Sequence, residues 1–255
     1  MTLKEKESPL KVLSNENYVR QRLNPSPFDI DYLHLKDLGA LIRKIASEVR
    51  GVVFDFGSGG APYSRLFSQC ERYIAADLEP GPSVDRVLRP DGHTDESDGS
   101  VDFILSSQVL EHVKDSRLYL QECHRILCSG GRILLTTHGM VEEHGCPHDY
   151  QRWTVRGLEE LFLEAGFQII QSGKLTTEIR GIVQLMNQFA QHLRFKDSML
   201  LHIILSIVRK LYIRALMPLL NKFADLFDKQ SIVNAPCDDS IYIAVFVYAR
   251  KTAEH

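Results

Sequence analysis

The sequence predicts an α/β protein with a doubly wound, mostly parallel β-sheet, and three observations lead to this prediction. Short apolar runs alternate with segments whose apolar residues recur at helical spacing, as in a parallel sheet covered by helices on both faces. The first run, Val52–Phe56, is followed at once by a glycine-rich turn, and the second ends in Asp77. The chain has 255 residues, which suffices for one such domain and a modest extension.

The first half of the chain contains the expected elements in this order. Apolar residues recur at helical spacing from residue 31 to residue 50, and Gly51 ends this predicted helix. The run 52–56 is continuously apolar apart from Asp55, which is typical of a buried parallel strand. By the same reasoning we expect a short helix over 63–68, a strand over 73–78 and a weak strand over 85–88.

The second half continues the alternation up to a long helical segment. Thr154 is a plausible N-cap and Gly166 a plausible end of the helix between them. The other expected elements are strands over 101–106, 132–137, 167–172 and 241–248, a helix over 115–127 closed by Gly130 and Gly131, and mostly helical structure between the last two strands.

The composition limits the class of protein. Apolar residues make up 44% of the chain and charged residues 25%, as in ordinary globular domains, and the net charge of −3 argues against a general nucleic-acid binder. The five cysteines form no C-x-x-C pair, and no apolar signal segment opens the chain, so we expect a reducing, cytoplasmic environment. We expect residues 1–30 to form an N-terminal tail.

The carboxyl ends of the first two strands carry the residues most typical of a ligand site. In open α/β sheets ligands bind at these ends, near the point where the strand order reverses. Glycines in the turn Asp55-x-Gly57-x-Gly59 allow a ligand to approach the backbone closely. Asp77 could accept both hydrogen bonds of a ribose diol, or it could be a solvated acid at a strand end.

This pattern is close to that of nicotinamide-binding proteins but differs from it in two details. The third glycine of their G-x-G-x-x-G fingerprint is Pro62 here. Asp55 also lies inside the strand, where its charge would repel a pyrophosphate but would suit a ligand with a cationic amino acid end.

Three motifs resemble those of class I S-adenosylmethionine-dependent methyltransferases, type 11 subgroup. Val53–Gly59 resembles their first motif, D-x-G-x-G, and Asp98–Ile104 followed by Leu110–Val113 resembles "D-x-S-F-D … L-E-H". Leu127–Leu134 is similar to the "L-x-P-G-G-x-L" turn, with Ser129 where proline is usual. The resemblance covers about residues 52–170. It implies a Rossmann-like sheet of seven strands with an antiparallel last strand and a helical insertion before it.

The resemblance also implies the residues that bind the cofactor, S-adenosylmethionine. Asp77 would hold the ribose, Leu78 would pack on the adenine, and Asp91 would contact the adenine amino group, although Asp91 lies in a loop rich in acids. The methionine end and the wall near the sulfonium would be formed by Asp55, Gly57, Ser58, Gly59, Ser107, Gln108 and Val109.

A hydroxyl acceptor requires a base, and candidates follow the fourth and fifth strands. His112 belongs to the family's E-H pattern and could be a base or part of the cofactor wall. His148–Thr154 resembles an "H-D-x-x-R-[WYF]-T" element of type 11 methyltransferases linked with polysaccharide or glycolipid pathways. His148 beside Asp149 could be a tuned base, with Arg152 binding an anionic acceptor group. Alternatively, Asp149 and Arg152 could pair with each other before the helix.

We adopt no metal site from the sequence. His144, Cys146 and His148 are possible zinc or iron ligands, but alternate residues on a loop rarely form a closed site.

The segment 175–240 is expected to be a helical insertion or lid. Its apolar residues recur at helical spacing: Ile179, Ile182, Val183, Leu185, Met186, Phe189 and Leu193. It could cover the acceptor pocket, or it could lie on a membrane with Arg209, Lys210 and Arg214 toward lipid headgroups. It could also form a dimer surface, so both a monomer and a homodimer remain open. These charges argue against a membrane-spanning helix.

Together these observations predict a methyltransferase domain formed by residues 31–174 and 241–255. We expect O-methylation of a sugar, glycolipid or small-metabolite acceptor. Two alternatives remain: a non-catalytic module that binds the adenosyl cofactor, and a nicotinamide-dependent oxidoreductase.

Overall fold

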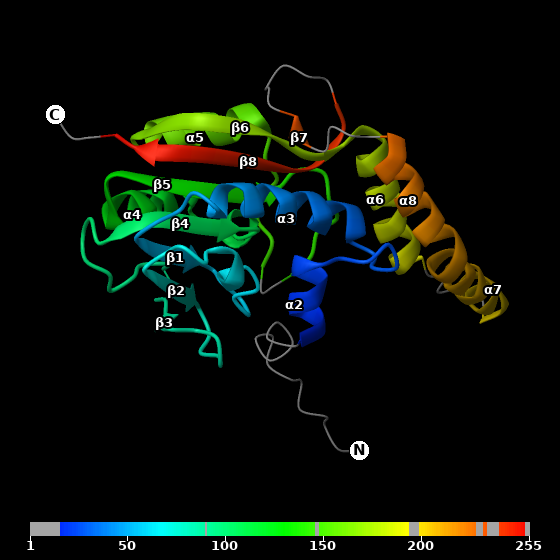
Figure 1. Ribbon diagram of the computed structural model, residues 1–255. Helices are drawn as coiled ribbons and strands as arrows, with labels where there is room; N and C mark the ends of the chain where they lie inside the picture. Colours follow the sequence, from blue (N-terminus) through cyan, green and yellow to red (C-terminus); the bar gives the residue numbers. More distant parts are fainter. Residues whose placement is uncertain are drawn as a thin grey trace.

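One mixed sheet forms the centre of the protein (Figure 1). The computed structural model describes residues 16–89, 91–145, 148–193, 199–227, 232–233 and 240–252. Within these described residues, the sheet has eight strands in the order β3-β2-β1-β4-β5-β8-β6-β7. The strands are β1 (Val52–Phe56), β2 (Arg72–Asp77), β3 (Arg86–Val87), β4 (Val101–Ser107), β5 (Leu127–His138), β6 (Phe167–Thr177), β7 (Ile232–Val233) and β8 (Tyr242–Lys251).

The strand directions confirm the predicted doubly wound sheet. Strands β1 to β5 pair in parallel, whereas β8 is antiparallel to both β5 and β6. The predicted seven strands are therefore present, and the two-residue strand β7 adds an eighth at the edge beside β6. The strand order reverses between β1 and β4, which is where such sheets bind ligands.

Helices cover both faces of the sheet because the apolar side chains of each strand alternate. Val53 packs in a cluster with Leu38 and Ile42 of α3 (Tyr32–Ala46), whereas the neighbouring Phe54 packs in a second cluster with Tyr119 of α4 (Ser116–Ile126) and Phe162 of α5 (Val155–Glu164). The helices are α2 (Glu16–Leu23), α3 (Tyr32–Ala46), α4 (Ser116–Ile126), α5 (Val155–Glu164), α6 (Glu178–His192), α7 (Met199–Leu211) and α8 (Met217–Phe227), with short 3₁₀ turns η1 (Ser64–Leu66) and η2 (Leu110–His112).

Capping residues fix the ends of α5 as the sequence predicts. The Thr154 hydroxyl accepts a hydrogen bond from the Gly157 N–H at 3.1 Å, and Gly166 follows the helix with φ +84°. At α4 the Asp115 carboxylate accepts hydrogen bonds from two backbone N–H groups. The expected turn at Gly130 and Gly131 is instead part of β5, because this strand begins directly after α4.

Part of the range assigned to an N-terminal tail is helical. Residues 16–23 form α2, and the Arg43 guanidinium of α3 donates a hydrogen bond to the Leu23 carbonyl at 3.2 Å. Arg20 also pairs with Asp29 at 3.0 Å. The part of the range before residue 16 lies outside the described residues.

Helices α6, α7 and α8 form the expected helical extension beside α3 (Figure 1). The extension was expected to begin at residue 175, but residues 175–177 belong to β6, which runs to Thr177. The buried Arg180 guanidinium of α6 pairs with Asp37 of α3 at 2.5 Å and also with Asp225 of α8. In contrast, α7 extends away from the sheet and exposes many apolar side chains. Among the described residues, no helix is long and apolar enough to cross a membrane.

Candidate cofactor and acceptor site

The turn after β1 lies against the segment after β4. Gly57 has a φ of +78°, and the N–H groups of Gly57 and Ser58 both donate to the Ala76 carbonyl at 2.9 Å. A Cβ atom on Gly57 would lie 2.6 Å from Val109 Cγ2, which is closer than two such atoms can approach. Gly57 is therefore required both by its backbone conformation and by this contact.

Asp77 at the end of β2 is oriented by the same turn. Its Oδ2 accepts a hydrogen bond from the Gly59 N–H at 2.7 Å, and its Oδ1 accepts one from the Leu78 N–H at 2.8 Å. Each carboxylate oxygen can accept a second hydrogen bond, so the side chain can still bind a ligand diol. The Leu78 side chain is half exposed beside it.

Asp55 is buried beneath this turn. The Tyr73 hydroxyl donates a hydrogen bond to Asp55 Oδ2 at 2.5 Å. Burial raises the pKa of Asp55 to about 7, because the Tyr73 hydrogen bond only partly offsets the loss of water and Asp77 adds negative charge nearby. A cationic ligand group beside Asp55 would favour its ionised form.

The remaining predicted cofactor residues lie on two loops. Ser107 ends β4, and Gln108 follows with a φ of +58° and donates from its N–H to the Thr136 carbonyl of β5 at 2.9 Å. Asp91 is exposed, and its Oδ1 accepts a hydrogen bond from the His93 N–H in the loop after β3.

Asp149 and Arg152 form a clasp in the loop after β5. The two guanidinium nitrogens Nη1 and Nη2 of Arg152 each donate to one oxygen of Asp149 at 2.5 Å, and Arg152 also donates to the Glu142 carbonyl. This ion pair holds the pKa of Asp149 well below its usual range. The structure thus contains the Asp149–Arg152 pair that the sequence left open as an alternative.

The ring of one predicted histidine, His112, contacts the backbone of the other, His148. The His148 ring is exposed and lies 5.7 Å from the Tyr150 ring, whereas the His148 carbonyl oxygen lies 2.6 Å from His112 Nδ1. The Asp149 carboxylate contacts His144 instead, with 3.4 Å between Oδ2 and His144 Nδ1.

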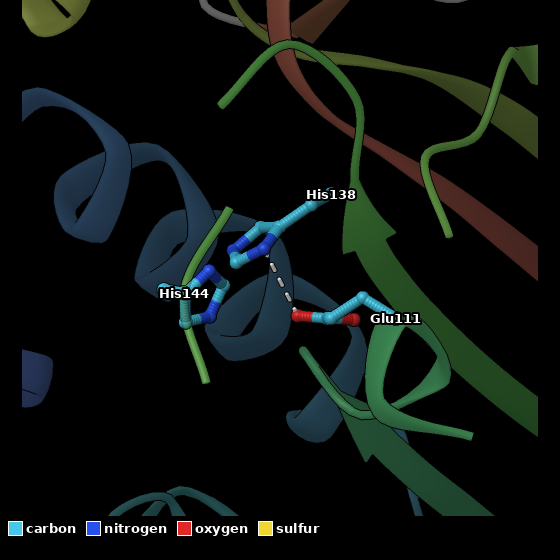
Figure 2. A group of neighbouring side chains, drawn as sticks. All are labelled: Glu111, His138 and His144. Carbon is cyan, nitrogen blue, oxygen red and sulfur yellow. Dashed lines mark ion pairs between the residues drawn. The ribbon is translucent and has the colours of Figure 1, made fainter. Parts of the chain in front are cut away.

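Three further residues meet at this place, and none was predicted from the sequence as part of the site (Figure 2). Glu111 is fully buried, and its Oε1 lies 3.2 Å from His138 Nδ1. The His144 ring lies 4.9 Å from the His138 ring and 5.1 Å from the His112 ring. Burial, together with the neighbouring histidines and the Arg152 guanidinium, lowers the pKa of His138 to about 2, so this imidazole is neutral.

One sequence signal could have pointed to these residues. His138 ends β5 and Glu111 follows β4, so both lie at the ligand-binding edge of the sheet. His144 joins them because its loop folds back over the edge. Of the cysteine and histidines weighed as metal ligands, Cys146 lies outside the described residues, and only His144 is in the cluster.

A family model decides the identity of the domain. The model, described as a methyltransferase domain, matches residues 32–172, which is more than half of the chain. The chain belongs to this methyltransferase family. The predicted cofactor, S-adenosylmethionine, and the predicted enzyme class are thereby confirmed. No curated protein matches this methyltransferase in sequence.

Solved structures share the fold of this methyltransferase. The [4+2]-cyclase SpnF is 17% identical, with a TM-score of 0.54 and coverage of 86% of this chain and 82% of that one. Phosphoethanolamine N-methyltransferase 2 of Haemonchus contortus, bound to S-adenosylmethionine, is 17% identical with a TM-score of 0.52 and coverage of 99% and 62%.

A third similar structure is the 1,6-didemethyltoxoflavin-N1-methyltransferase of Burkholderia thailandensis, with bound substrate and S-adenosylhomocysteine. It is 16% identical, with a TM-score of 0.51 and coverage of 99% of this chain and 94% of that one. At these identities the likeness concerns the fold, and the presence of a cyclase among the three shows that one fold supports different reactions.

Proposed function

We propose that this methyltransferase transfers the methyl group of S-adenosylmethionine to an oxygen atom of a sugar, a glycolipid or a small metabolite. The observation that supports an oxygen acceptor is the group of imidazoles around Glu111 at the ends of β4 and β5. A hydroxyl must lose a proton as it attacks, and such side chains can accept or stabilise it. The resemblance of His148–Thr154 to an element of glycan-linked methyltransferases supports the acceptor class.

The cofactor binds along the edge formed by β2, β1 and β4 in this proposal. Asp55, Gly57, Ser58 and Gly59 hold its methionine end. Asp77, Leu78 and Asp91 hold the adenosine. The hydrogen bonds of Asp77 to the Gly59 and Leu78 N–H groups support this assignment, since they fix the carboxylate and leave two acceptor positions open.

The wall of the site near the sulfonium is formed by Ser107, Gln108 and Val109. In the reaction a bond forms between the acceptor oxygen and the methyl carbon, and the carbon–sulfur bond breaks. Its electron pair stays on sulfur, which becomes a neutral thioether, and the hydroxyl proton passes to a base. Because sulfonium is a good leaving group, alignment and exclusion of water are the protein's main tasks.

His112 is the base that the contacts support best. If the Nδ1 of His112 carries the proton of its 2.6 Å contact with the His148 carbonyl, its Nε2 is left to accept a proton. In this arrangement His148 acts through its backbone, and Asp149 and Arg152 keep the loop in place.

The helical extension 175–240 serves as the acceptor-side cover in this proposal, with 31–174 and 241–255 as the cofactor domain. The apolar side chains that α7 exposes support an acceptor with a lipid part, or contact with a membrane surface, and Arg209 and Lys210 lie on the same helix. Cosedimentation with anionic vesicles tests the contact of α7 with a membrane surface. The double variant Ile203→Asp/Ile207→Asp should bind such vesicles more weakly than wild type.

An acceptor screen tests the proposed reaction. The protein is incubated with S-adenosylmethionine and with sugars, glycolipids or amines, and release of S-adenosylhomocysteine is measured. We expect turnover with a hydroxyl acceptor, and in His112→Ala a loss of about 100-fold or more with unchanged cofactor affinity. Turnover with amines alone would contradict an oxygen acceptor, and a fully active His112→Ala would remove His112 as the base.

A further inference from the structure

The cluster of Glu111, His138 and His144 has a geometry that proton transfer alone does not require. Each residue offers one ligand atom, and these atoms lie within 4.8 Å of one another (Figure 2). They come from three separate segments: the turn η2, the end of β5 and the loop after β5. Among the described residues, no other group of His, Cys, Asp or Glu side chains converges in this way.

Two atoms of the cluster are buried without a hydrogen bond. Glu111 Oε1 and His138 Nδ1 lie 3.2 Å apart, yet neither has a hydrogen-bond partner among the described residues. Buried polar atoms are rarely left in this state unless water or an ion completes them. In a tetrahedral zinc site with bonds of about 2.0–2.1 Å, neighbouring ligand atoms are about 3.3 Å apart. The observed separation matches this value.

We propose that Glu111, His138 and His144 bind one divalent transition-metal ion, such as zinc, at the acceptor side of the site. Two imidazoles and one carboxylate form a ligand set suited to zinc and similar ions, whereas magnesium and calcium prefer oxygen ligands. The ion would contact His138 Nδ1, Glu111 Oε1 and one ring nitrogen of His144. Three protein ligands leave at least one position open for another molecule.

The residues around the cluster orient its ligands. The Thr137 hydroxyl donates a hydrogen bond to Glu111 Oε2 at 2.8 Å, which leaves Oε1 toward His138. Asp149 faces His144 Nδ1 at 3.4 Å, which leaves Nε2 for the ion, and Asp149 is itself held by Arg152. A carboxylate behind a ligating histidine is the usual outer contact of protein metal sites.

The open position gives the ion a role in the reaction, and this role rests on the proposed function. A hydroxyl oxygen of the acceptor bound there would lose its proton more easily, because the positive ion stabilises the resulting alkoxide. The proton then passes to a base such as His112, whose ring lies 5.1 Å from the His144 ring. The alkoxide oxygen is the atom that attacks the methyl carbon.

Zinc titration of the chelator-treated protein tests the site without an acceptor. We expect one zinc ion per chain, and a loss of affinity of about ten-fold or more in each of Glu111→Gln, His138→Asn and His144→Ala. His202→Ala is the matched control, because His202 is exposed on α7 and should not affect the titration. His144 is only half-buried, so its variant should fold even if a change at the buried Glu111 does not.

Two further readouts separate the outcomes. Cobalt in place of zinc should give visible absorption bands that disappear in His144→Ala. Titration with S-adenosylmethionine should give the same affinity in wild type and His144→Ala. Zinc affinity unchanged in His144→Ala, or no zinc bound by wild type, would overturn the metal site. If the cofactor still binds and methyl transfer proceeds in that case, the proposed function stands without the ion.

Discussion

The turn after β1 and the loop after β5 prepare two neighbouring parts of the site by different means. The turn is shaped by glycines and backbone N–H groups, and the Gly59 N–H orients Asp77, which lies 18 positions later in the chain. At the loop, side chains from three segments meet: Asp149 pairs with Arg152 and lies beside His144, whose ring lies 4.9 Å from the His138 ring. The difference teaches that the proposed cofactor side depends on backbone conformation, whereas the proposed acceptor side depends on tertiary contacts between side chains.

Gly57→Ala should have the largest effect, because it breaks the backbone arrangement of the cofactor side. The new Cβ would lie 2.6 Å from Val109 Cγ2, and the residue would have to keep a φ of +78°. We expect S-adenosylmethionine affinity to fall about 100-fold or more and stability to fall by about 3 kcal/mol. Calorimetric titration and urea unfolding measure both.

Gly130→Ala separates the two causes of that loss. Gly130 has a similar φ of +76°, but a Cβ there would have no atom of the described part of the chain within 4 Å. Its cost should therefore be about 1 kcal/mol, with cofactor affinity unchanged. Val109→Ala combined with Gly57→Ala should recover part of the affinity. Equal losses in Gly57→Ala and Gly130→Ala would show that the contact with Val109 is unimportant.

Asp149→Asn tests the charge balance of the acceptor side. The Asp149 side chain is 1% exposed, and the variant would leave Arg152 without its carboxylate. We expect stability at pH 7 to fall by about 2–3 kcal/mol, less than for a fully buried pair because Arg152 is partly exposed. Cofactor affinity should change little, and a large loss of it would contradict the separation of the two sides.

The pH dependence of this difference follows from the lowered pKa of Asp149. A carboxylate whose folded pKa is depressed contributes stability that is fully present above its unfolded pKa of about 3.9 and is lost as the pH falls toward the folded value. The gap between wild type and Asp149→Asn in urea unfolding should be constant between pH 5 and 7 and should shrink below about pH 4. A gap that grows on acidification would contradict the ion pair.

Asp77→Asn should weaken S-adenosylmethionine binding by about 10- to 100-fold, which corresponds to one charge-assisted hydrogen bond of about 1.5–3 kcal/mol. The amide nitrogen would also face the Gly59 or Leu78 N–H, which now donate to carboxylate oxygens. Asp91→Asn is the comparison, since the exposed Asp91 should contribute less. Unchanged affinity in Asp77→Asn would remove Asp77 from the cofactor site.

The smallest effect concerns the protonation of Asp55. Its pKa of about 7 lies above its unfolded value, so the folded apoprotein holds an extra proton between about pH 4 and 7 and loses stability as the pH rises through this window. A cationic cofactor group beside Asp55 would release that proton. Binding enthalpy at pH 6 should therefore depend on the ionisation enthalpy of the buffer. Asp55→Asn should abolish the dependence, and its absence in wild type would contradict the contact.

The same contrast explains what the sequence could predict. The positions of the main strands along the chain, the turn at Gly57 and the cap at Thr154 follow from local spacing, so they were predictable. Helix α2 was missed because its residues are mostly polar, and strand β7 because it has two residues. The meeting of Glu111, His138 and His144 depends on how a loop folds over the sheet edge, and no local spacing encodes that. The sequence left two partners of Asp149 open, His148 and Arg152; the structure has Arg152 beside it together with His144, a contact that the sequence analysis did not include.

Calorimetric titration of wild type and Asp77→Asn with S-adenosylmethionine, S-adenosylhomocysteine and NAD tests the central assignment most directly. We expect micromolar binding of the two adenosyl compounds by wild type, at least ten-fold weaker binding by Asp77→Asn, and no binding of NAD. Binding of NAD, or adenosyl binding that is equally strong in both proteins, would contradict the assignment of the β1–β2 edge as the S-adenosylmethionine site.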